Sequence, residues 1–163
     1  MGHIVKVTDH IYWVGANDYR VDRFENLFPL KHGVAYNSYL ICDEKTCLMD
    51  TVDQAVTDQY LDNIKTALQE RDLDYLVINH MEPDHCGNIE TICRLYPNCQ
   101  LVGNSKTFQF LEQFYGTDYQ SRYYVVKEKE TLSLGQHTLQ FLMAPMAHWP
   151  EVMVVYEQSH KML

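Results

Sequence analysis

The sequence predicts an α/β domain in which sheets and helices pack as a layered sandwich. Strand-like stretches near the N-terminus follow one another closely, as in hairpins, and later stretches alternate with helical patterns. This order favours an α/β sandwich. The chain has 163 residues, of which 46% are apolar, and these are enough to bury one core. We find no repeat, linker or low-complexity tract, so we expect a single layered domain.

Short apolar runs predict the strands, and apolar residues at helical spacing predict the helices. The expected strands are residues 4–7, 11–14, 35–41, 46–49, 75–78, 100–102, 123–126, 138–143 and 152–156. The expected helices are residues 54–70, 88–96 and 106–115. The first helix has one apolar stripe, formed by Val56, Tyr60, Ile64 and Leu68. Asn104 and Ser105 are capping candidates ahead of the last helix, and Gly116 is its expected stop.

A dense group of metal-binding side chains lies between the strand expected at 75–78 and the helix expected at 88–96. Within the sequence Asn-His-Met-Glu-Pro-Asp-His, these side chains are His80, Glu82, Asp84 and His85. Imidazoles combined with carboxylates and open positions suit iron or manganese, and suit catalytic zinc less well. The alternative is a solvated turn with one ion pair. We favour a metal site, because so many possible ligands directly follow a buried strand.

The backbone determines whether these side chains can converge. In an extended segment His80, Glu82 and Asp84 share one face, whereas in a helix the first two would point about 200° apart. Pro83 favours the extended form, because proline is poorly tolerated inside a helix and pushes the preceding residue toward extended dihedrals. We expect the chain to turn after Asp84, which lets His85 point back toward the same pocket.

His148 is a further candidate ligand. It lies in the segment Ala-Pro-Met-Ala-His-Trp-Pro, residues 144–150, which follows the strand expected at 138–143. The prolines predict a loop, and loops at strand ends commonly carry ligands. Taken alone, a histidine in a loop is more often a surface residue. Together with the earlier group, it is better explained as a member of the same pocket.

These motifs resemble the N-terminal part of a flavodiiron protein. The resemblance is carried by His80-x-Glu82-x-Asp84-His85, by Tyr-Asn-Ser-Tyr-Leu at 36–40, by Leu-Met-Asp-Thr-Val at 48–52 and by His-Trp-Pro-Glu at 148–151. It runs over nearly the whole chain. In that family a metallo-β-lactamase-like αββα sandwich carries two irons, and a flavodoxin-like domain with FMN follows it. Ordinary metallo-β-lactamase hydrolases have a histidine at the position of Glu82.

The resemblance also implies a division of the ligands. His80, Glu82 and His148 would bind the iron nearer the flavin, and Asp84 and His85 would bind the second iron. The family's bridging aspartate and its last histidine are not found up to Leu163, nor is the flavodoxin-like domain. Two metals normally share a bridge. We therefore expect partial or single-metal occupancy of this partial domain, residues 1–163. We expect His160 to be a turn residue and not a ligand.

The function that the resemblance implies is an oxidoreductase that reduces dioxygen to water or nitric oxide to nitrous oxide. FMN would deliver the electrons, and a rubredoxin-like donor or a flavin reductase would refill it. Two alternatives stay open: a zinc-dependent hydrolase of the metallo-β-lactamase type and an inactive metal-binding remnant. Half of a sandwich would leave an apolar sheet face in water. We therefore expect a piece of a longer protein, a homodimer or a complementing chain.

Composition restricts the binding partners and the cellular location that we expect for the protein. The formal net charge of −9 argues against nucleic acid and anionic membranes as partners. No apolar run approaches the roughly 18 residues that a membrane span needs, and residues 1–3 lead into a strand without a signal peptide. The five scattered cysteines indicate buried thiols in a reducing compartment, so a cytoplasmic location is expected. For Cys86, beside His85, we favour packing over catalysis.

One charged segment has no assigned structure. Residues 17–31 include Asp18, Arg20, Asp22, Arg23 and Glu25 and are expected to form a long loop. This loop either folds over the metal pocket or is a solvated excursion.

Overall fold

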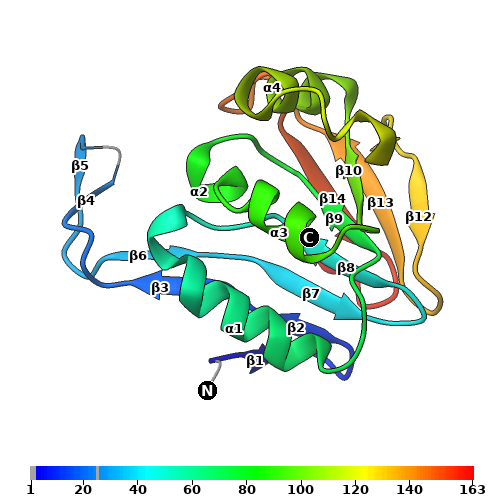
Figure 1. Ribbon diagram of the computed structural model, residues 1–163, viewed down its shortest axis with the longest axis horizontal. Coiled ribbons are helices and arrows are strands. Elements are labelled where there is room, and N and C mark those ends of the chain that lie inside the picture. Colours follow the sequence, from blue (N-terminus) through cyan, green and yellow to red (C-terminus); the bar gives the residue numbers. More distant parts are fainter. Residues whose placement is uncertain (1–2, 25) are drawn as a thin grey trace.

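A computed structural model describes residues 3–24 and 26–163 (Figure 1). Met1 and Gly2, at the start of the segment expected to lack a signal peptide, and Glu25 of the charged loop lie outside the described residues. Within these ranges a seven-stranded sheet has helices on one face and a three-stranded sheet on the other. The predicted α/β sandwich is therefore confirmed, and the second sheet already begins within this chain.

The large sheet changes from antiparallel to parallel halfway across. Its order is β1 (Val5–Lys6), β2 (Ile11–Trp13), β7 (Tyr39–Cys42), β8 (Thr46–Met49), β9 (Tyr75–Val77), β10 (Gln100–Gly103) and β11 (Tyr123–Val125). Pairs from β1 to β8 are antiparallel, and pairs from β8 to β11 are parallel. The carboxyl ends of β8, β9 and β10 consequently meet at one edge of the sheet. Asp50, His80 and Asn104 follow these strands, which places them at that edge.

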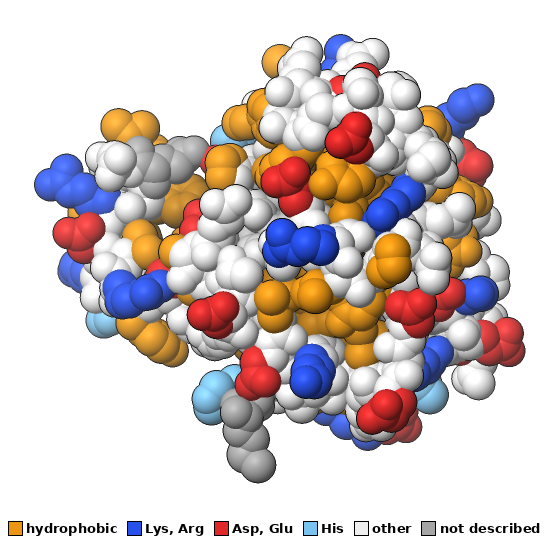
Figure 2. Space-filling model, in the orientation of Figure 1, with side chains coloured by type: hydrophobic (Ala, Val, Ile, Leu, Met, Phe, Trp, Pro, Cys, Tyr) orange, Lys and Arg blue, Asp and Glu red, His pale blue; other side chains and the backbone are white. Residues whose placement is uncertain are grey.

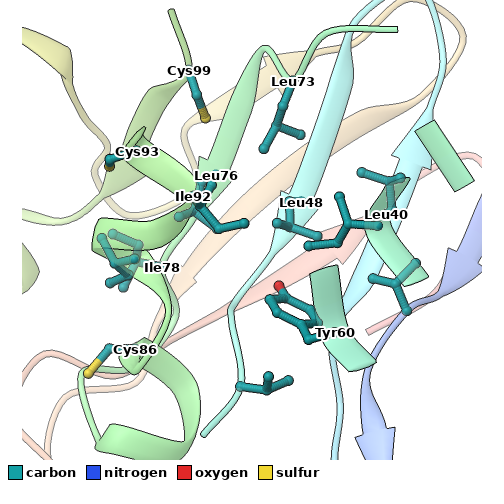
Figure 3. Close-up of a cluster of buried hydrophobic side chains, with 14 of the residues drawn as sticks. Leu40, Leu48, Tyr60, Leu73, Leu76, Ile78, Cys86, Ile92, Cys93 and Cys99 are labelled. Carbon is teal, nitrogen blue, oxygen red and sulfur yellow. The ribbon is translucent and has the colours of Figure 1, made fainter. Parts of the chain in front are cut away.

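The helices cover one face of the large sheet. They are α1 (Thr57–Leu68), α2 (Pro83–Cys86), α3 (Ile89–Leu95) and α4 (Ser105–Tyr115), with 3-10 turns at Gln54–Val56 and Gln120–Arg122. Leu76 and Leu101 of the sheet pack toward this layer, where Figure 3 shows Tyr60 of α1 and Ile92 of α3. Side chains of a strand alternate between its two faces. The residues next to Leu76 and Leu101 in these strands therefore point to the other side of the sheet, where they belong to a second core.

The small antiparallel sheet packs on that other side. It consists of β12 (Thr131–Ser133), β13 (Thr138–Met143) and β14 (Met153–Glu157). Val77 and Val102 of the large sheet lie in one buried cluster with Leu139, Phe141 and Val155 of the small sheet. β12 is the element of this sheet that the sequence did not predict, whereas β13 has the predicted bounds.

The strand predicted at 35–41 is wrong as a single element. It divides into β6 (Val34–Tyr36), which pairs with β3 (Ala16–Asp18), and β7 of the large sheet. The facing chain passes from β2 to β3 at the same place, and its backbone approaches so closely that a Cβ on Gly15 would collide with the carbonyl of Tyr36. Between β6 and β7 Ser38 points inward, where its hydroxyl donates to the carbonyl of Asp50 at 3.1 Å.

The predicted helices are close to those observed. The helix expected at 54–70 starts as a 3-10 turn and becomes α1, which ends at Leu68 before Gln69 with φ 56°. The helix expected at 106–115 is α4. The side chain of Asn104 accepts hydrogen bonds from the amides of Lys106 and Thr107, and Gly116 ends the helix with φ 80°.

The segment 17–31 is not a single loop. It contains the end of β3 and a ribbon of β4 (Arg23–Phe24) and β5 (Phe28–Pro29), which projects from the body of the domain (Figures 1 and 2). Figure 2 shows acidic and basic side chains scattered among apolar ones on the helical face. None of the helices in the described part of the chain has the length and hydropathy that a bilayer crossing requires.

Candidate metal centre

The main cluster of possible ligands forms where β9 leaves the large sheet. His80 is only 6% exposed and Glu82 only 7%. Glu82 has φ −69° and ψ 146°, so the extended backbone predicted ahead of Pro83 is confirmed. Met81, between them, is fully buried in the helix-side core. Alternation along this extended stretch therefore puts His80 and Glu82 together on the opposite side, toward the cluster.

The prediction that Asp84 continues the extended segment is wrong. Pro83 begins the short helix α2, so Asp84 lies in its first turn. The amides of His85 and Cys86 donate to the carbonyl of Glu82 at 2.8 Å and 2.9 Å. Proline suits the first helical position, because its amide has no hydrogen to satisfy and its φ is preset for the helix. Pro83 therefore starts the turn that we expected to come two residues later.

Glu82 joins the two histidines that come from different parts of the chain. Its Oε2 atom lies 3.0 Å from Nε2 of His80 and 2.7 Å from Nε2 of His148. One donor atom from each of these three residues lies within 4.8 Å of the other two. His148 is supplied by the loop between β13 and β14, where its backbone has φ 97° and its side chain is 55% exposed. The predicted convergence of positions 80, 82 and 148 is therefore observed.

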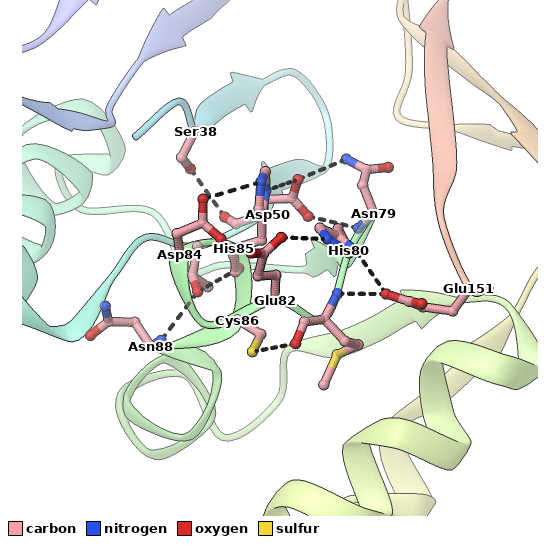
Figure 4. Close-up of polar contacts among 12 residues, drawn as sticks. Ser38, Asp50, Asn79, His80, Glu82, Asp84, His85, Cys86, Asn88 and Glu151 are labelled. Atoms are coloured by element: carbon pink, nitrogen blue, oxygen red, sulfur yellow. Dashed lines mark hydrogen bonds and ion pairs between the residues drawn. The ribbon is translucent and has the colours of Figure 1, made fainter. Parts of the chain in front are cut away.

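Asp84 and His85 form a neighbouring pair. Nε2 of His85 lies 3.7 Å from Oδ2 of Asp84, and its Nδ1 lies 3.2 Å from Oδ2 of Asp50. The imidazole rings of His80 and His85 are 5.2 Å apart, so the pair adjoins the three-residue cluster without belonging to it (Figure 4). Burial raises the pKa of the Asp84 carboxyl. Burial acts to lower the pKa of His85, but the hydrogen bond to Asp50 and the negative charges of Asp50, Asp84 and Glu82 together outweigh it and raise this pKa.

The charged segment 17–31 reaches this area. Arg23 and Phe24 line a cavity of about 340 Å³ together with Glu82 and Asp84. Of the two interpretations left open by the sequence, the first is therefore favoured: part of this segment borders the pocket. Arg23 and Phe24 form β4, so it is this strand of the ribbon that borders the pocket.

The donor set and its surroundings fit a metal ion. His80, Glu82 and His148 present two imidazole nitrogens and a carboxylate, the ligand types of non-haem iron and of catalytic zinc. Oδ1 of Asp84 is buried and has no hydrogen-bond partner. A buried carboxylate oxygen in that state is costly unless a cation or water satisfies it. His85 and Asp84 are the residues best placed to hold a second ion.

A comparison with protein families decides the affiliation of the chain. The family model described as "ODP family beta lactamase" matches residues 34–163. This chain belongs to that family. The match includes all five candidate ligands of the ODP-family chain and the strands on which they depend.

Individual relatives agree with the family model. A nitric oxide reductase from Moorella thermoacetica is 37% identical over 164 residues, covering 100% of the ODP-family chain and 41% of the relative. An anaerobic nitric oxide reductase flavorubredoxin from Vibrio vulnificus is 32% identical, covering 93% of the chain and 31% of the relative. The chain thus spans well under half of the length of these relatives.

Solved structures show the same fold. The flavodiiron protein from Giardia intestinalis matches with a TM-score of 0.89 and 29% identity, over 96% of this chain and 38% of that one. The rubredoxin oxygen:oxidoreductase from Desulfovibrio gigas matches with a TM-score of 0.89 and 34% identity, over 95% and 38%. The predicted resemblance to the metallo-β-lactamase-like domain of flavodiiron proteins is therefore confirmed for this ODP-family chain.

Two carboxylates in the site were not singled out from the sequence. Glu151 is 1% exposed, and its Oε1 lies 2.7 Å from Nδ1 of His80. Asp50 contacts His85 and accepts a hydrogen bond from the amide of Asn79 at 2.6 Å. Both residues lie in segments on which the family resemblance rests, residues 48–52 and 148–151. This resemblance was the one sequence signal that could have marked them as site residues. Their roles depend on contacts across 71 and 35 positions of sequence, which residue patterns do not report.

Proposed function

We propose that this chain provides the iron-binding part of an oxidoreductase that reduces dioxygen to water or nitric oxide to nitrous oxide. The observation that carries the proposal is the convergence of Nε2 of His80, Oε2 of Glu82 and Nε2 of His148. A carboxylate at position 82 distinguishes this donor set from the all-histidine set of the hydrolytic branch. The names of the Moorella and Desulfovibrio proteins, a nitric oxide reductase and an oxygen oxidoreductase, support the same reaction class.

In this proposal the side chains of the chain hold the metal ligands in place and orient them. Glu151 fixes the ring of His80 so that its other nitrogen faces Glu82. Trp149 packs edge-on against the ring of His80 at 5.1 Å and limits the access of water to it. Iron held by these donors would supply the electron-transfer chemistry that the side chains themselves lack.

We propose that the three-residue cluster binds metal more tightly than the Asp84 and His85 pair. The cluster offers three donors within 4.8 Å of one another, and two of its residues are buried. The pair offers two donors, and each is partly exposed. Affinity rises with the number of preorganised ligands. The isolated chain should therefore hold roughly one iron, as a three-ligand site with an open position would.

The electron supply lies in parts of the relatives that this chain does not match. We propose FMN on a flavodoxin-like partner or domain as the immediate donor, refilled by a rubredoxin-like protein or a flavin reductase. Association with a second copy or with a complementing chain stays a prediction. It is supported by an apolar hollow of about 540 Å³ between the two sheets, which reaches His85. Sedimentation measurements on the purified chain would test this association.

Metal analysis after anaerobic purification separates the candidate functions. The parent chain is loaded with Fe(II), desalted and analysed for iron and zinc, alongside Glu82→Gln, His148→Ala and the control His32→Ala. His32 is an exposed histidine outside the site. We expect iron in the parent and in the control, and its loss from the two site variants. Tightly bound zinc with ester hydrolysis would instead favour a hydrolase, and no bound metal would favour an inactive remnant.

Activity provides the second test. Reduced FMN is added to the iron-loaded chain, and consumption of dioxygen or nitric oxide is followed with an electrode. We expect consumption that depends on Glu82 and is unaffected by His32→Ala. Iron binding without any consumption of either gas would contradict the proposed reaction. Two irons held equally tightly by the three-residue cluster and by the Asp84 and His85 pair would contradict the proposed difference between these two groups of ligands.

A further inference from the structure

We propose that the chain has a second metal site, unrelated to the first, formed by His137, Glu157 and His160 and suited to Zn²⁺ or a similar divalent transition-metal ion. These residues were not candidates from the sequence. His160 was expected to be a turn residue, and it does lie in the turn that follows β14.

The proposed site lies at the opposite end of the small sheet from His148. His137 immediately precedes β13, and Glu157 is the last residue of the antiparallel strand β14. The amide of Gln158 donates to the carbonyl of Thr138 at 3.0 Å, which holds these two ends together. The loop that carries His148 joins the other ends of the same strands. Six residues of β13 separate the two ends, or roughly 20 Å of strand.

Three donors already lie close together there. One donor atom from each of the three residues lies within 4.8 Å of the other two. His137 is 2% exposed and Glu157 is 4% exposed, so two of the three are held by the core. Zinc ligands at about 2.0 to 2.1 Å from the ion lie roughly 3.3 Å from one another. The side chain of His160 is 41% exposed and can close the remaining gap by turning.

The state of His137 is the observation that points to a ligand. Its Nδ1 lies 2.7 Å from Oδ2 of Asp43, which also accepts from the backbone amide of His137 at 2.7 Å. Its other ring nitrogen, Nε2, is buried and has no hydrogen-bond partner. A carboxylate on one imidazole nitrogen and a metal on the other is the usual arrangement of histidine ligands. Glu151 and His80 repeat this arrangement in the first site.

A purely structural role of His137 and Glu157 leaves one buried ring nitrogen of His137 unexplained. Glu157 accepts from the backbone amides of Ser159 and His160, at 2.9 Å and 2.7 Å, so it also shapes the turn. The contact between Nδ1 of His137 and Asp43 accounts for one side of the His137 ring. Neither contact satisfies Nε2 of His137, whereas a metal ion shared with Glu157 and His160 would satisfy it.

The open side of the site can admit water or an exogenous ligand. A cavity of about 810 Å³ borders it, lined in part by Thr8, His10, His137 and His160. Three protein donors with one open position make the coordination typical of an accessible zinc site. His10 lies edge-on to His137, with the ring centroids 5.6 Å apart, and is a neighbour that the proposal does not require.

Nuclear magnetic resonance of the histidine side chains tests this site separately from the first. The imidazole nitrogen signals of the ¹⁵N-labelled chain are followed while Zn²⁺ is added, and affinity is read from the signals of His137 and His160. We expect both signals to shift together. His160→Ala should weaken the binding reported by His137 by more than the roughly 10- to 100-fold that loss of an outer-shell partner costs. Asp43→Asn, which removes such a partner, should fall within that range.

The exposed histidine variant His32→Ala is the control and should leave this affinity unchanged. His160→Ala is the deciding variant, because its side chain is partly exposed and its removal does not disturb the core. Glu157→Gln supplies a second ligand variant and should also weaken the binding. The proposal is overturned if the His137 signal does not shift when Zn²⁺ is added. It is also overturned if this signal reports equal Zn²⁺ affinity in the parent and in His160→Ala. Metal bound or absent at the first site changes neither of these outcomes, because the affinity is read from signals of His137 and His160 themselves.

Discussion

Nδ1 of His80 lies 2.7 Å from Oε1 of Glu151, although the two residues are 71 positions apart. The same oxygen accepts a hydrogen bond from the backbone amide of Met81 at 2.9 Å. Glu151 thereby fixes both the imidazole ring and the backbone beside it. The other ring nitrogen of His80, Nε2, is directed at Glu82. The contact joins the loop before β14 to the carboxyl end of β9, so it couples the small sheet to the site on the large one.

The first prediction concerns this contact. Glu151→Gln keeps the shape of the side chain and removes its charge, so His80 should be oriented less firmly. We expect Fe(II) affinity at the first site to fall roughly 10- to 100-fold, the range for lost outer-shell partners. Competition with a coloured chelator measures it, with the exposed Glu70→Gln as control. Equal affinity in parent and variant would show that the contact does not position the ligand.

The second prediction concerns Asn104, which has two roles. Its Oδ1 caps α4, and its Nδ2 donates to the carbonyl of Glu151 at 2.7 Å. Asn104→Ala removes both interactions and should cost about 1 to 2 kcal/mol of unfolding free energy. Asn104→Asp keeps a capping oxygen and should cost less. Urea unfolding of the three proteins measures this, and equal losses in both variants would argue against a contribution from the cap.

The third prediction concerns thiol reactivity. Burial raises the pKa of the Cys93 thiol to about 11, so little thiolate exists there at neutral pH. Four cysteines are buried, and Cys42 is partly exposed. At pH 8 the native chain should react with a disulfide reagent only at Cys42 on the time scale of minutes, and at every cysteine after unfolding. Cys42→Ser should remove the fast reaction. A fast reaction that persists in this variant would contradict the assignment.

The fourth prediction concerns pH and Asp74. Burial opposes ionisation of this carboxyl, but hydrogen bonds from the Thr46 amide and from Lys45 outweigh burial and lower its pKa. A lowered pKa in the folded state gives stability that is present above the unfolded value of about 3.9 and is lost as the pH falls through the folded value. Asp74→Asn should therefore cost about 1 to 2 kcal/mol at pH 7.

This cost should shrink when the unfolding free energy is measured near pH 3, because Asp74 of the parent is then increasingly protonated. The exposed Asp118→Asn serves as the control and should show little change at either pH. A cost for Asp74→Asn that is the same at both pH values would show that the charge of Asp74 is not what stabilises the fold.

Local patterns were sufficient for strands that coincide with short apolar runs. β8 and β13 were predicted with their observed bounds, because each is such a run with side chains buried in the cores. The start of α4 was predicted because the amide groups of its first turn need an acceptor, and Asn104 supplies one. Residues 37 and 38 gave no such signal, and the break there coincides with a close approach of Gly15 to the carbonyl of Tyr36, which is remote in sequence.

The sequence by itself determined which kinds of donor follow which strands, because residue type and alternation are local properties. It thus supplied His80 and Glu82 as neighbours on one side of an extended segment. The sequence also indicated His148 as a member of the same pocket, but only the tertiary structure fixed its contact with Glu82, 66 positions away, and showed that Glu151 orients His80. The physical reason is that distances between remote side chains are set by how the two sheets pack, and no local preference encodes that packing.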